Sequence, residues 1–285
     1  MASSSSPYMF NRDHKASVRL NYQHWATKQL CGGYLLHPSI PTSNVRRVAD
    51  IGTGTAIWPV ELSQTLSPDI QIDAFDVSRA QYPPNEWVPG NVKLHTHDAF
   101  LPFPEKHVGR YDVVHVRFFV TLLNPENIQR FIQNVVALLR PDGYLQWFDA
   151  NPSTAKATAI NPTTSKVAVE KLAALMRKPR PDSSYEWIPS LPELVQSSSS
   201  SHLNIITNDV IDSSAFNPSR TLWNHCHLLG YEEFAAQVAA RDAKSDVAVR
   251  AHQTLADVAI EMAAGANLEV DKFCLVAKVT IEEDT

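Results

Sequence analysis

A turn of small residues directly after an apolar run constrains the fold of this chain more than any other feature. The run Val45–Ile51 is typical of a buried strand, and "GTGTA" follows it without interruption. Apolar residues then resume at helical spacing, which predicts a helix over Ala56–Leu66. A strand, a tight turn and a helix in this order form the first half of a unit that builds parallel sheets.

Strand-like and helix-like segments continue to alternate after this first unit. Apolar patterns predict further strands over Ile70–Ser78, Val92–Phe100, Tyr111–Phe119, Tyr144–Phe148, Leu203–Asp209 and Asp271–Ile281. The most regular helix, Ile128–Leu139, carries one apolar face and is followed by the helix-stopping sequence "RPDG". We therefore predict an α/β fold with a Rossmann-like, seven-stranded, mostly parallel sheet, helices on both faces and a helical cap.

The helical patterns outside the sheet predict a core and a cap. Residues 1–40 are expected to form an N-terminal helical cap segment. Residues 212–270 are expected to form a helical cap or substrate-binding insertion, because the connection between the last two strands is too long for a hairpin turn. The core is expected to comprise residues 41–211 and 271–285.

Composition restricts the partners of the chain. Its 285 residues, 44% of them hydrophobic, suffice for one enlarged domain or for a domain with a cap. A net charge of -5 without a basic tract argues against a nucleic-acid partner. Scattered cysteines favour a reducing compartment, and neither a signal peptide nor a membrane-spanning run stands out. We expect a cytoplasmic protein without a nucleic-acid or membrane partner.

Two His-x-His pairs raise the question of a metal. His95 and His97 lie in one predicted strand and point to the same face, and His225 and His227 form the second pair. Zinc would need one or two further ligands at tetrahedral geometry, and the spacing offers no third partner. No metal site is predicted.

The small-residue turn and the acids after neighbouring strands predict a nucleoside pocket. Ligands of open parallel sheets bind beyond the carboxyl ends of the strands. Gly52 and Gly54 can adopt unusual torsions and let the backbone approach a ligand, while Ala56 is expected to pack the helix against the strand. Asp76 follows at roughly 20 residues, the distance at which an acid can bind ribose hydroxyls. Asp98 ends the next strand, where it can meet an adenine amino group.

The acid before the turn disfavours a dinucleotide, because Asp50 would repel a pyrophosphate and suits an ammonium or sulfonium group. The segments "VADIGTGTAIW", "IDAFDVS", "HDAF", "YDVVHVRFF" and "LLRPDGYLQW", in this order, closely resemble the class I S-adenosylmethionine-dependent methyltransferases. Within that superfamily, "NRDHKASVRLNYQHW", "GYLLHPSIP" and "GYLQWFDA" look like a fungal branch of small-molecule biosynthesis. The chain departs from the usual pattern at Asn11, Ala56 and Phe148–Asp149.

The resemblance implies S-adenosylmethionine as cofactor and assigns residues to each of its parts. Asp50 is placed for the ammonium end, and Arg19 for the carboxylate. The other implied contacts are Gly52, Thr53 and Gly54 along the methionine and ribose, Asp76 at the ribose hydroxyls, Val77 beside the adenine, Asp98 and Ala99 at its edge, Phe100 at its face, and Arg117 and Phe118 across the pocket.

Methyl transfer is an in-line displacement, and alignment alone can supply ~7–11 kcal/mol. A general base is needed only if the acceptor arrives protonated. His24 on the N-terminal helix is the first candidate for this base, and His225 and His227 are the second. Asp149 could orient the substrate or cap the loop after the fifth strand.

The leading hypothesis is a methyltransferase that acts on a small, aromatic or polycyclic secondary metabolite, with O-methylation as first choice and N-methylation as second. A homodimer is a further expectation. One alternative is an enzyme that binds S-adenosylmethionine without transferring its methyl, such as a cyclase. The other is a methyltransferase-like regulator.

Overall fold

The computed structural model describes residues 10–179, 184–198, 202–211, 217–241 and 246–280. The chain divides into two compact units. The core unit consists of Cys31–Ala150, Asp182–Ile211 and Lys272–Thr285, and the helical unit of Met1–Leu30, Asn151–Pro181 and Asp212–Asp271. Residues 151–181, which the sequence analysis assigned to the core, cluster with the helical unit.

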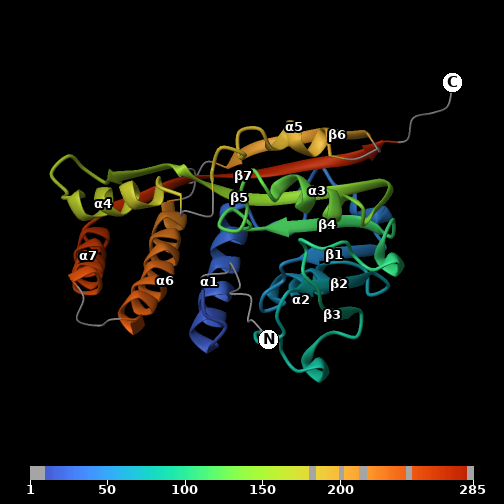
Figure 1. Ribbon diagram of the computed structural model, residues 1–285, viewed down its shortest axis with the longest axis horizontal. Helices are drawn as coiled ribbons and strands as arrows, with labels where there is room; N and C mark the ends of the chain where they lie inside the picture. The colour runs from blue at the N-terminus through green and yellow to red at the C-terminus, as the bar shows by residue number, and fades with distance from the viewer. Residues whose placement is uncertain (1–9, 180–183, 199–201, 212–216, 242–245, 281–285) are drawn as a thin grey trace. The chain divides into compact units, whose positions relative to one another are not determined.

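The predicted seven-stranded, mostly parallel sheet is confirmed. Its strands are β1 (Arg47–Ile51), β2 (Gln71–Asp76), β3 (Val92–Thr96), β4 (Tyr111–Arg117), β5 (Leu139–Ala159), β6 (His202–Ile211) and β7 (Ala266–Thr280). They lie in the order β3-β2-β1-β4-β5-β7-β6 (Figure 1). β1 pairs in parallel with β2 and β4, β2 with β3, and β4 with β5, whereas β6 runs antiparallel to β7.

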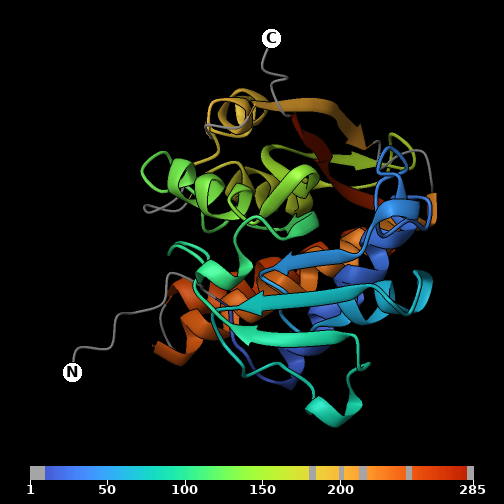
Figure 2. The same cartoon turned by 90° about the vertical axis from the view of Figure 1, so that its right-hand side faces the viewer.

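The winding of the chain brings three strand ends to one edge. The chain starts the sheet at β1, moves outward through β2 and β3, and then returns to β4 on the other side of β1. Figure 2 shows the arrowheads of β1, β2 and β3 pointing the same way. The turn after β1 therefore lies where the order of the sheet reverses, the usual ligand position in such folds.

Helices of the core unit are α2 (Ile57–Thr65), α3 (Ile128–Val136) and α5 (Leu191–Gln196), with short 3-10 turns η1 (Thr42–Asn44), η2 (Asn85–Trp87) and η3 (Glu105–His107). The predicted apolar face of α3 is buried: Phe131 and Ile132 are 0% exposed. The Phe131 ring lies 4.5 Å from that of Phe119 and 5.4 Å from that of Trp147. These contacts fix α3 against the strands that carry the site.

Two strands are longer than the sequence patterns indicate. The strand predicted over Tyr144–Phe148 is part of β5, which continues to Ala159. Ala155 and Ala157 are buried while Lys156 between them is exposed, so small and polar residues alternate here without the bulky side chains that identify a strand. The last predicted strand begins earlier, at Ala266, and its expected final residue, Ile281, lies outside the described residues.

The helical unit contains α1 (His14–Leu30), α4 (Val167–Met176), α6 (Asn217–Arg241) and α7 (Asp246–Ala263). α6 contacts both α1 and α7, and α4 contacts α7. Glu261 of α7 accepts the backbone N–H groups of Val167, Ala168 and Val169 at 3.0, 2.8 and 3.0 Å, which caps the start of α4.

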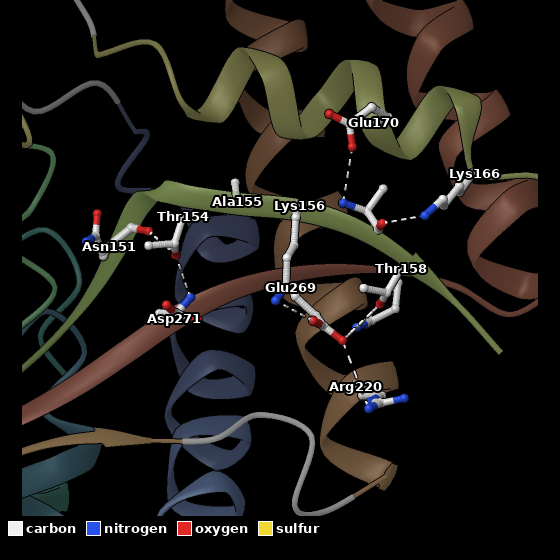
Figure 3. Close-up of polar contacts among 12 residues, drawn as sticks. Asn151, Thr154, Ala155, Lys156, Thr158, Lys166, Glu170, Arg220, Glu269 and Asp271 are labelled. Atoms are coloured by element: carbon white, nitrogen blue, oxygen red, sulfur yellow. Dashed lines mark hydrogen bonds and ion pairs between the residues drawn. The ribbon is translucent and has the colours of Figure 1, made fainter.

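Polar contacts join the ends of β5 and β7 within the helical unit. Figure 3 shows Glu269 of β7 joined to Lys156 and Thr158 of β5 and to Arg220 of α6. The Thr158 hydroxyl donates to Glu269 Oε1 at 2.8 Å, and Lys156 Nζ lies 3.5 Å from Oε2. A partly buried carboxylate thus connects the strands to a helix by charge as well as by packing.

A buried carboxylate of β2 also joins the first four strands of the sheet order, β3, β2, β1 and β4. Asp73 of β2 accepts hydrogen bonds from His95 Nε2 at 2.6 Å, from the Tyr111 hydroxyl at 3.0 Å and from Arg47 Nη2 at 3.1 Å. Burial opposes the charged form, but the hydrogen bonds outweigh it and lower the pKa of Asp73 to about 2. The folded state therefore holds this proton less tightly than the unfolded chain does.

The lowered pKa predicts an acid-sensitive contribution to stability. Asp73 should contribute ~2 kcal/mol above pH ~4, because its pKa falls from 3.8 to about 2 on folding, and this contribution should be lost as the pH falls through about 2. Urea unfolding of the wild type and of Asp73→Asn at pH 6 and pH 3 measures it. The destabilisation by Asp73→Asn should be smaller at pH 3, whereas Asp69→Asn, at an exposed turn, should leave stability unchanged at both. Equal effects of Asp73→Asn at the two pH values would refute the assignment.

Candidate functional site: the strand ends around Asp50 and Asp76

The turn after β1 is tied to the end of β2 by three backbone donors. The N–H groups of Gly52 and Thr53 both donate to Phe75 O, at 2.8 and 2.9 Å. The N–H of Gly54 donates to Asp76 Oδ2 at 2.9 Å, and Ser78 N donates to Oδ1 at 3.0 Å. The glycine turn and the carboxylate that the sequence paired at a distance are thus in direct contact.

The conformation of this turn explains its small residues. Gly52 and Gly54 have φ values of 71° and 58°, in the left-handed region that favours glycine. Gly52 is exposed, yet a Cβ on it would lie 2.6 Å from Cε2 of the Phe119 ring. Ala56 also has a positive φ, 61°, although alanine pays ~1–2 kcal/mol for that region. Its methyl group is fully buried, so the expected packing role comes with backbone strain.

Asp50 is buried at the end of β1 and bonds to a histidine that the sequence analysis did not single out. His115 of β4 is its register partner, and Nδ1 of that ring lies 2.7 Å from Asp50 Oδ1. Both residues are at most 3% exposed. The imidazole stacks on Trp58 of α2 at 3.8 Å between centroids and 5° between planes. The signal that the sequence offered for this pair was a polar residue inside the apolar run "VVHVR". Strand pairing places that residue opposite the acid of β1.

The carboxyl ends of β2 and β3 carry the residues assigned to the adenine. Val77 is 51% exposed, so its apolar surface is open to contact. Asp98 Oδ1 accepts Phe100 N at 3.0 Å, and Ala99 O accepts Asn134 Nδ2 at 3.0 Å. The Phe100 ring packs 5.5 Å from the core residue Phe131, so part of it belongs to the core.

Tyr82 is a second residue that the sequence analysis missed. Its hydroxyl donates to His95 O at 2.6 Å. Burial raises the pKa of the Tyr82 phenol, and the negative charges of Asp76 and Asp50 raise it further. A neutral hydroxyl thus lies near both carboxylates, and nothing in the pattern "QYPPN" predicts it.

The turn after β4 holds Arg117 and Phe118. Burial lowers the pKa of Arg117, and the nearby Asp50 carboxylate opposes this. Phe118 has a φ of 59°, a strained value for an aromatic residue. Its ring meets Phe148 edge-on at 5.4 Å. Arg117 and Phe118 thus lie at the same edge of the sheet as Asp50, as the order of the motifs in the sequence implies.

Asp149 of β5 caps the turn after β4. The carboxylate is 0% exposed. Its Oδ2 accepts Phe119 N at 2.8 Å, Val120 N at 3.1 Å and Trp147 Nε1 at 3.2 Å, and Oδ1 accepts Ala150 N at 2.9 Å. The geometry therefore supports a capping role for Asp149 over a role in orienting the substrate. The turn that it caps follows the fourth strand, and not the fifth as expected.

The remaining sequence candidates lie in the helical unit. Arg19 of α1 pairs with Glu233 of α6 at 2.8 Å, and its guanidinium lies 4.5 Å from the Phe10 ring centroid. Its expected contact with the cofactor carboxylate stays a prediction.

The three histidines differ in their surroundings. His24 is buried in α1, with 4% exposure. His225 of α6 is exposed, and its Nδ1 lies 3.0 Å from the Tyr22 hydroxyl. His227 lies two residues further along α6, with its ring 5.9 Å from that of Trp223. Their catalytic roles stay predictions.

The donor set suits the cofactor that the sequence implies. Asp50 offers a carboxylate to an ammonium group, and Asp76 offers acceptors to ribose hydroxyls. The Thr53 hydroxyl is buried and has no hydrogen-bond partner among the described residues, as expected of a group completed by a ligand. Across the described ranges, no three His, Cys, Asp or Glu residues gather as a metal site would require. His95 pairs with Asp73, and His97 Nε2 lies 3.2 Å from Leu101 O.

The order of the sheet, the turn after β1 and the carboxylates at neighbouring strand ends define a Rossmann-like nucleoside-binding domain. A model of the methyltransferase domain family matches residues 22–192. The chain therefore belongs to the methyltransferase domain family, within its class I S-adenosylmethionine-dependent members, and its cofactor is S-adenosylmethionine.

Fungal proteins are among the relatives. The chain is 34% identical to methyltransferase grgD of a Penicillium species, over 50% of this chain and 52% of that protein. It is 31% identical to N-methyltransferase tcpN of Claviceps purpurea, over 50% of this chain and 51% of that protein. The chain spans about half the length of the curated relatives it matches. These matches support the fungal branch that the sequence resembles.

Solved structures share the fold at low identity. Mycolic acid cyclopropane synthase CmaA1, complexed with S-adenosylhomocysteine, aligns with a TM-score of 0.52 at 12% identity, over 95% of this chain and 89% of that chain. The [4+2]-cyclase SpnF aligns with a TM-score of 0.50 at 14% identity, over 93% and 95%. At such identities the likeness concerns the fold alone. No helix within the described residues is long and apolar enough to cross a membrane.

Proposed function

We propose that this protein transfers a methyl group from S-adenosylmethionine to a heteroatom of a small secondary metabolite. One observation carries the proposal. In a chain of the methyltransferase domain family, the bond of 2.9 Å between Gly54 N and Asp76 Oδ2 joins the small-residue turn to an acid at the next strand end. A backbone open to close approach and an acceptor for ribose hydroxyls then stand at one point.

The proposed roles follow from the chemistry of each side chain. Asp50 holds the ammonium group. The buried Thr53 hydroxyl gains a hydrogen-bond partner in the methionine–ribose portion, and Asp76 accepts hydrogen bonds from the ribose hydroxyls. Val77 offers an exposed apolar surface to the adenine. When bound, S-adenosylmethionine supplies a methyl group on a positively charged sulfur. The other proposed contacts are those of Arg19, Gly52, Gly54, Asp98, Ala99, Phe100, Arg117 and Phe118.

We assign acceptor binding to the helical unit. It contains most of the two cap segments expected at 1–40 and 212–270, together with the candidate bases. His225 is exposed and its imidazole is oriented by the Tyr22 hydroxyl, which suits a group that takes a proton from an acceptor. His24 and His227 are the other candidates for this base. An acceptor that arrives deprotonated would need none of the three.

Nitrogen is the acceptor atom that we propose to test first. The relatives from Claviceps purpurea and Clonostachys rogersoniana are named N-methyltransferases. Oxygen was the first expectation from the sequence and is the second class to test. Flat aromatic substrates suit the aromatic residues of the helical unit, and they are the first panel to try with both acceptor types.

Binding and transfer can be tested separately. Calorimetry on the full chain should show S-adenosylhomocysteine binding that Asp76→Ala weakens at least about tenfold, since hydrogen bonds to a charged group are worth ~1.5–3 kcal/mol. Asp69→Ala, at an exposed turn of the same unit, is the matched control and should bind like the wild type. Absence of binding to folded wild-type protein would end the proposal.

Transfer is then measured with methyl-labelled S-adenosylmethionine and a panel of aromatic amines and phenols. Label in a product establishes methylation and identifies the acceptor atom. Conversion of a substrate without incorporation of label would favour the cyclase-like alternative. The support for that alternative is a likeness in fold to the [4+2]-cyclase SpnF. Binding of the cofactor together with protein partners, and with no turnover, would favour the regulator.

A further inference from the structure

A buried histidine that stacks on a tryptophan is paired with the carboxylate assigned to the cofactor's ammonium group. Asp50 Oδ1 and His115 Nδ1 lie 2.7 Å apart between neighbouring parallel strands. Both side chains are almost fully buried, at 5% and 2% exposure. The pair is therefore shielded from the solvent that would otherwise reorient a carboxylate.

The chemistry of the pair fixes the position of one proton. Burial lowers the pKa of His115, although the bond to Asp50 opposes this, so the imidazole is neutral. A neutral imidazole has one N–H, and a carboxylate can only accept. The hydrogen is thus on Nδ1, and it points at Asp50 Oδ1. Because the His115 imidazole is neutral, it leaves the negative charge of Asp50 in place. A positively charged imidazolium would offset that charge.

The ring that donates this hydrogen cannot easily turn. Trp58 covers its face at 3.8 Å with the planes 5° apart, and Trp58 itself is 2% exposed. His115 also lies between Val114 and Val116, which are both fully buried. The direction of the Nδ1–H group is therefore set by packing from α2 and by the backbone of β4.

We propose that His115 is a positioning residue, which fixes the rotamer of Asp50 so that its second carboxylate oxygen faces the ammonium group of S-adenosylmethionine. The inference rests on the proposed function of the site. It predicts that loss of the Nδ1–H group weakens binding of ligands that carry the amino-acid portion. Binding of the nucleoside portion, which Asp50 does not contact, should be unaffected.

Two ligands and three variants test this. S-adenosylhomocysteine carries the ammonium group, and 5′-deoxy-5′-methylthioadenosine has the same nucleoside and sulfur without the amino acid. His115→Phe keeps a ring that can stack on Trp58 but removes the donor. His115→Asn places an amide nitrogen near the position of Nδ1, whereas His115→Gln places it near Nε2. Calorimetry on the full chain gives the affinity of each variant for each ligand.

We expect His115→Phe to lower the affinity for S-adenosylhomocysteine at least about tenfold, because it removes one hydrogen bond to a charged group. The affinity for methylthioadenosine should stay within about twofold of the wild-type value. His115→Asn should recover most of the loss and His115→Gln should not. Unchanged affinity of His115→Phe for S-adenosylhomocysteine would overturn the inference, and so would equal weakening of both ligands. If His115→Phe does not fold, equal affinities of the Asn and Gln variants overturn it.

The controls separate this inference from the function on which it rests. Wild-type protein that binds neither ligand refutes the proposed function, and with it any role of His115 at the cofactor. Wild-type protein that binds both, with variants that show no selective effect, refutes only the positioning role. Near-UV circular dichroism of each variant reports the packing of Trp58 and so verifies that the stack is kept.

Discussion

Replacing Asp149 by alanine should destabilise the protein by about 4 kcal/mol, because four N–H donors would lose their acceptor and each buried unsatisfied donor costs ~1–3 kcal/mol. The donors are the backbone groups of Phe119, Val120 and Ala150 and the indole Nε1 of Trp147. Asp149 is 0% exposed, so bulk water cannot replace it without opening the structure. Urea unfolding at pH 7 measures the loss.

The isosteric variant separates volume from hydrogen bonding. Asp149→Asn keeps the size of the side chain but retains one oxygen, so it should cost about half as much as Asp149→Ala. Asp69→Ala, an exposed change in the same unit, should cost less than ~0.5 kcal/mol. A loss below ~1 kcal/mol for Asp149→Ala would show that the carboxylate does not hold the turn after β4.

The pH dependence of this effect has a defined sign. Burial raises the pKa of Asp149 to about 7, while the surrounding N–H donors oppose the shift. The folded state therefore binds this proton more tightly than the unfolded chain, and the contribution is fully present below pH ~4 and lost as the pH rises through about 7. The destabilisation by Asp149→Ala should accordingly be larger at pH 6 than at pH 8, by about 1 kcal/mol.

Gly52→Ala should combine a loss of stability of about 3 kcal/mol with a loss of cofactor affinity. The left-handed φ of 71° costs alanine ~1–2 kcal/mol, and displacement of a packed ring costs a further ~1–3 kcal/mol. The new Cβ would lie 2.6 Å from Cε2 of Phe119. Phe119 cannot retreat freely, because its backbone N–H is held by Asp149 at 2.8 Å.

The affinity and stability effects of Gly52→Ala are measured on the same samples. Affinity for S-adenosylhomocysteine should fall at least about tenfold, or ~1.4 kcal/mol, since the turn must shift to accept the methyl group. Gly90→Ala is the matched control: nothing lies within 4 Å of its Cβ position, and its φ is not in the left-handed region. Wild-type affinity in Gly52→Ala would mean that the turn does not line the cofactor.

The coupling of Gly52, Phe119 and Asp149 could not have been predicted from local patterns. The sequence places these residues in three separate segments, and only the pairing of β4 with β5 brings Asp149 under the turn that carries Phe119. Asp50 and His115 were likewise 65 residues apart in the chain, and a histidine inside an apolar strand has no periodicity of its own. By contrast, the sequence did place the small-residue turn and Asp76 at one edge of the sheet, where Gly54 N donates to Asp76 Oδ2, because the first two strands of this parallel sheet are adjacent and their ends coincide.

The sequence by itself determined the class of fold and the central strands with their connecting helices, and it predicted the strand edge at which a nucleoside would bind. These features follow from hydrophobic periodicity and from small residues at a turn. Both are local patterns that can be recognised within a short stretch of sequence. Only the tertiary structure decided which polar groups are paired: Asp50 with His115, Asp73 with His95, and Asp149 with the turn after β4. The reason is physical, because a buried carboxylate is satisfied by donors from whichever strands pack beside it.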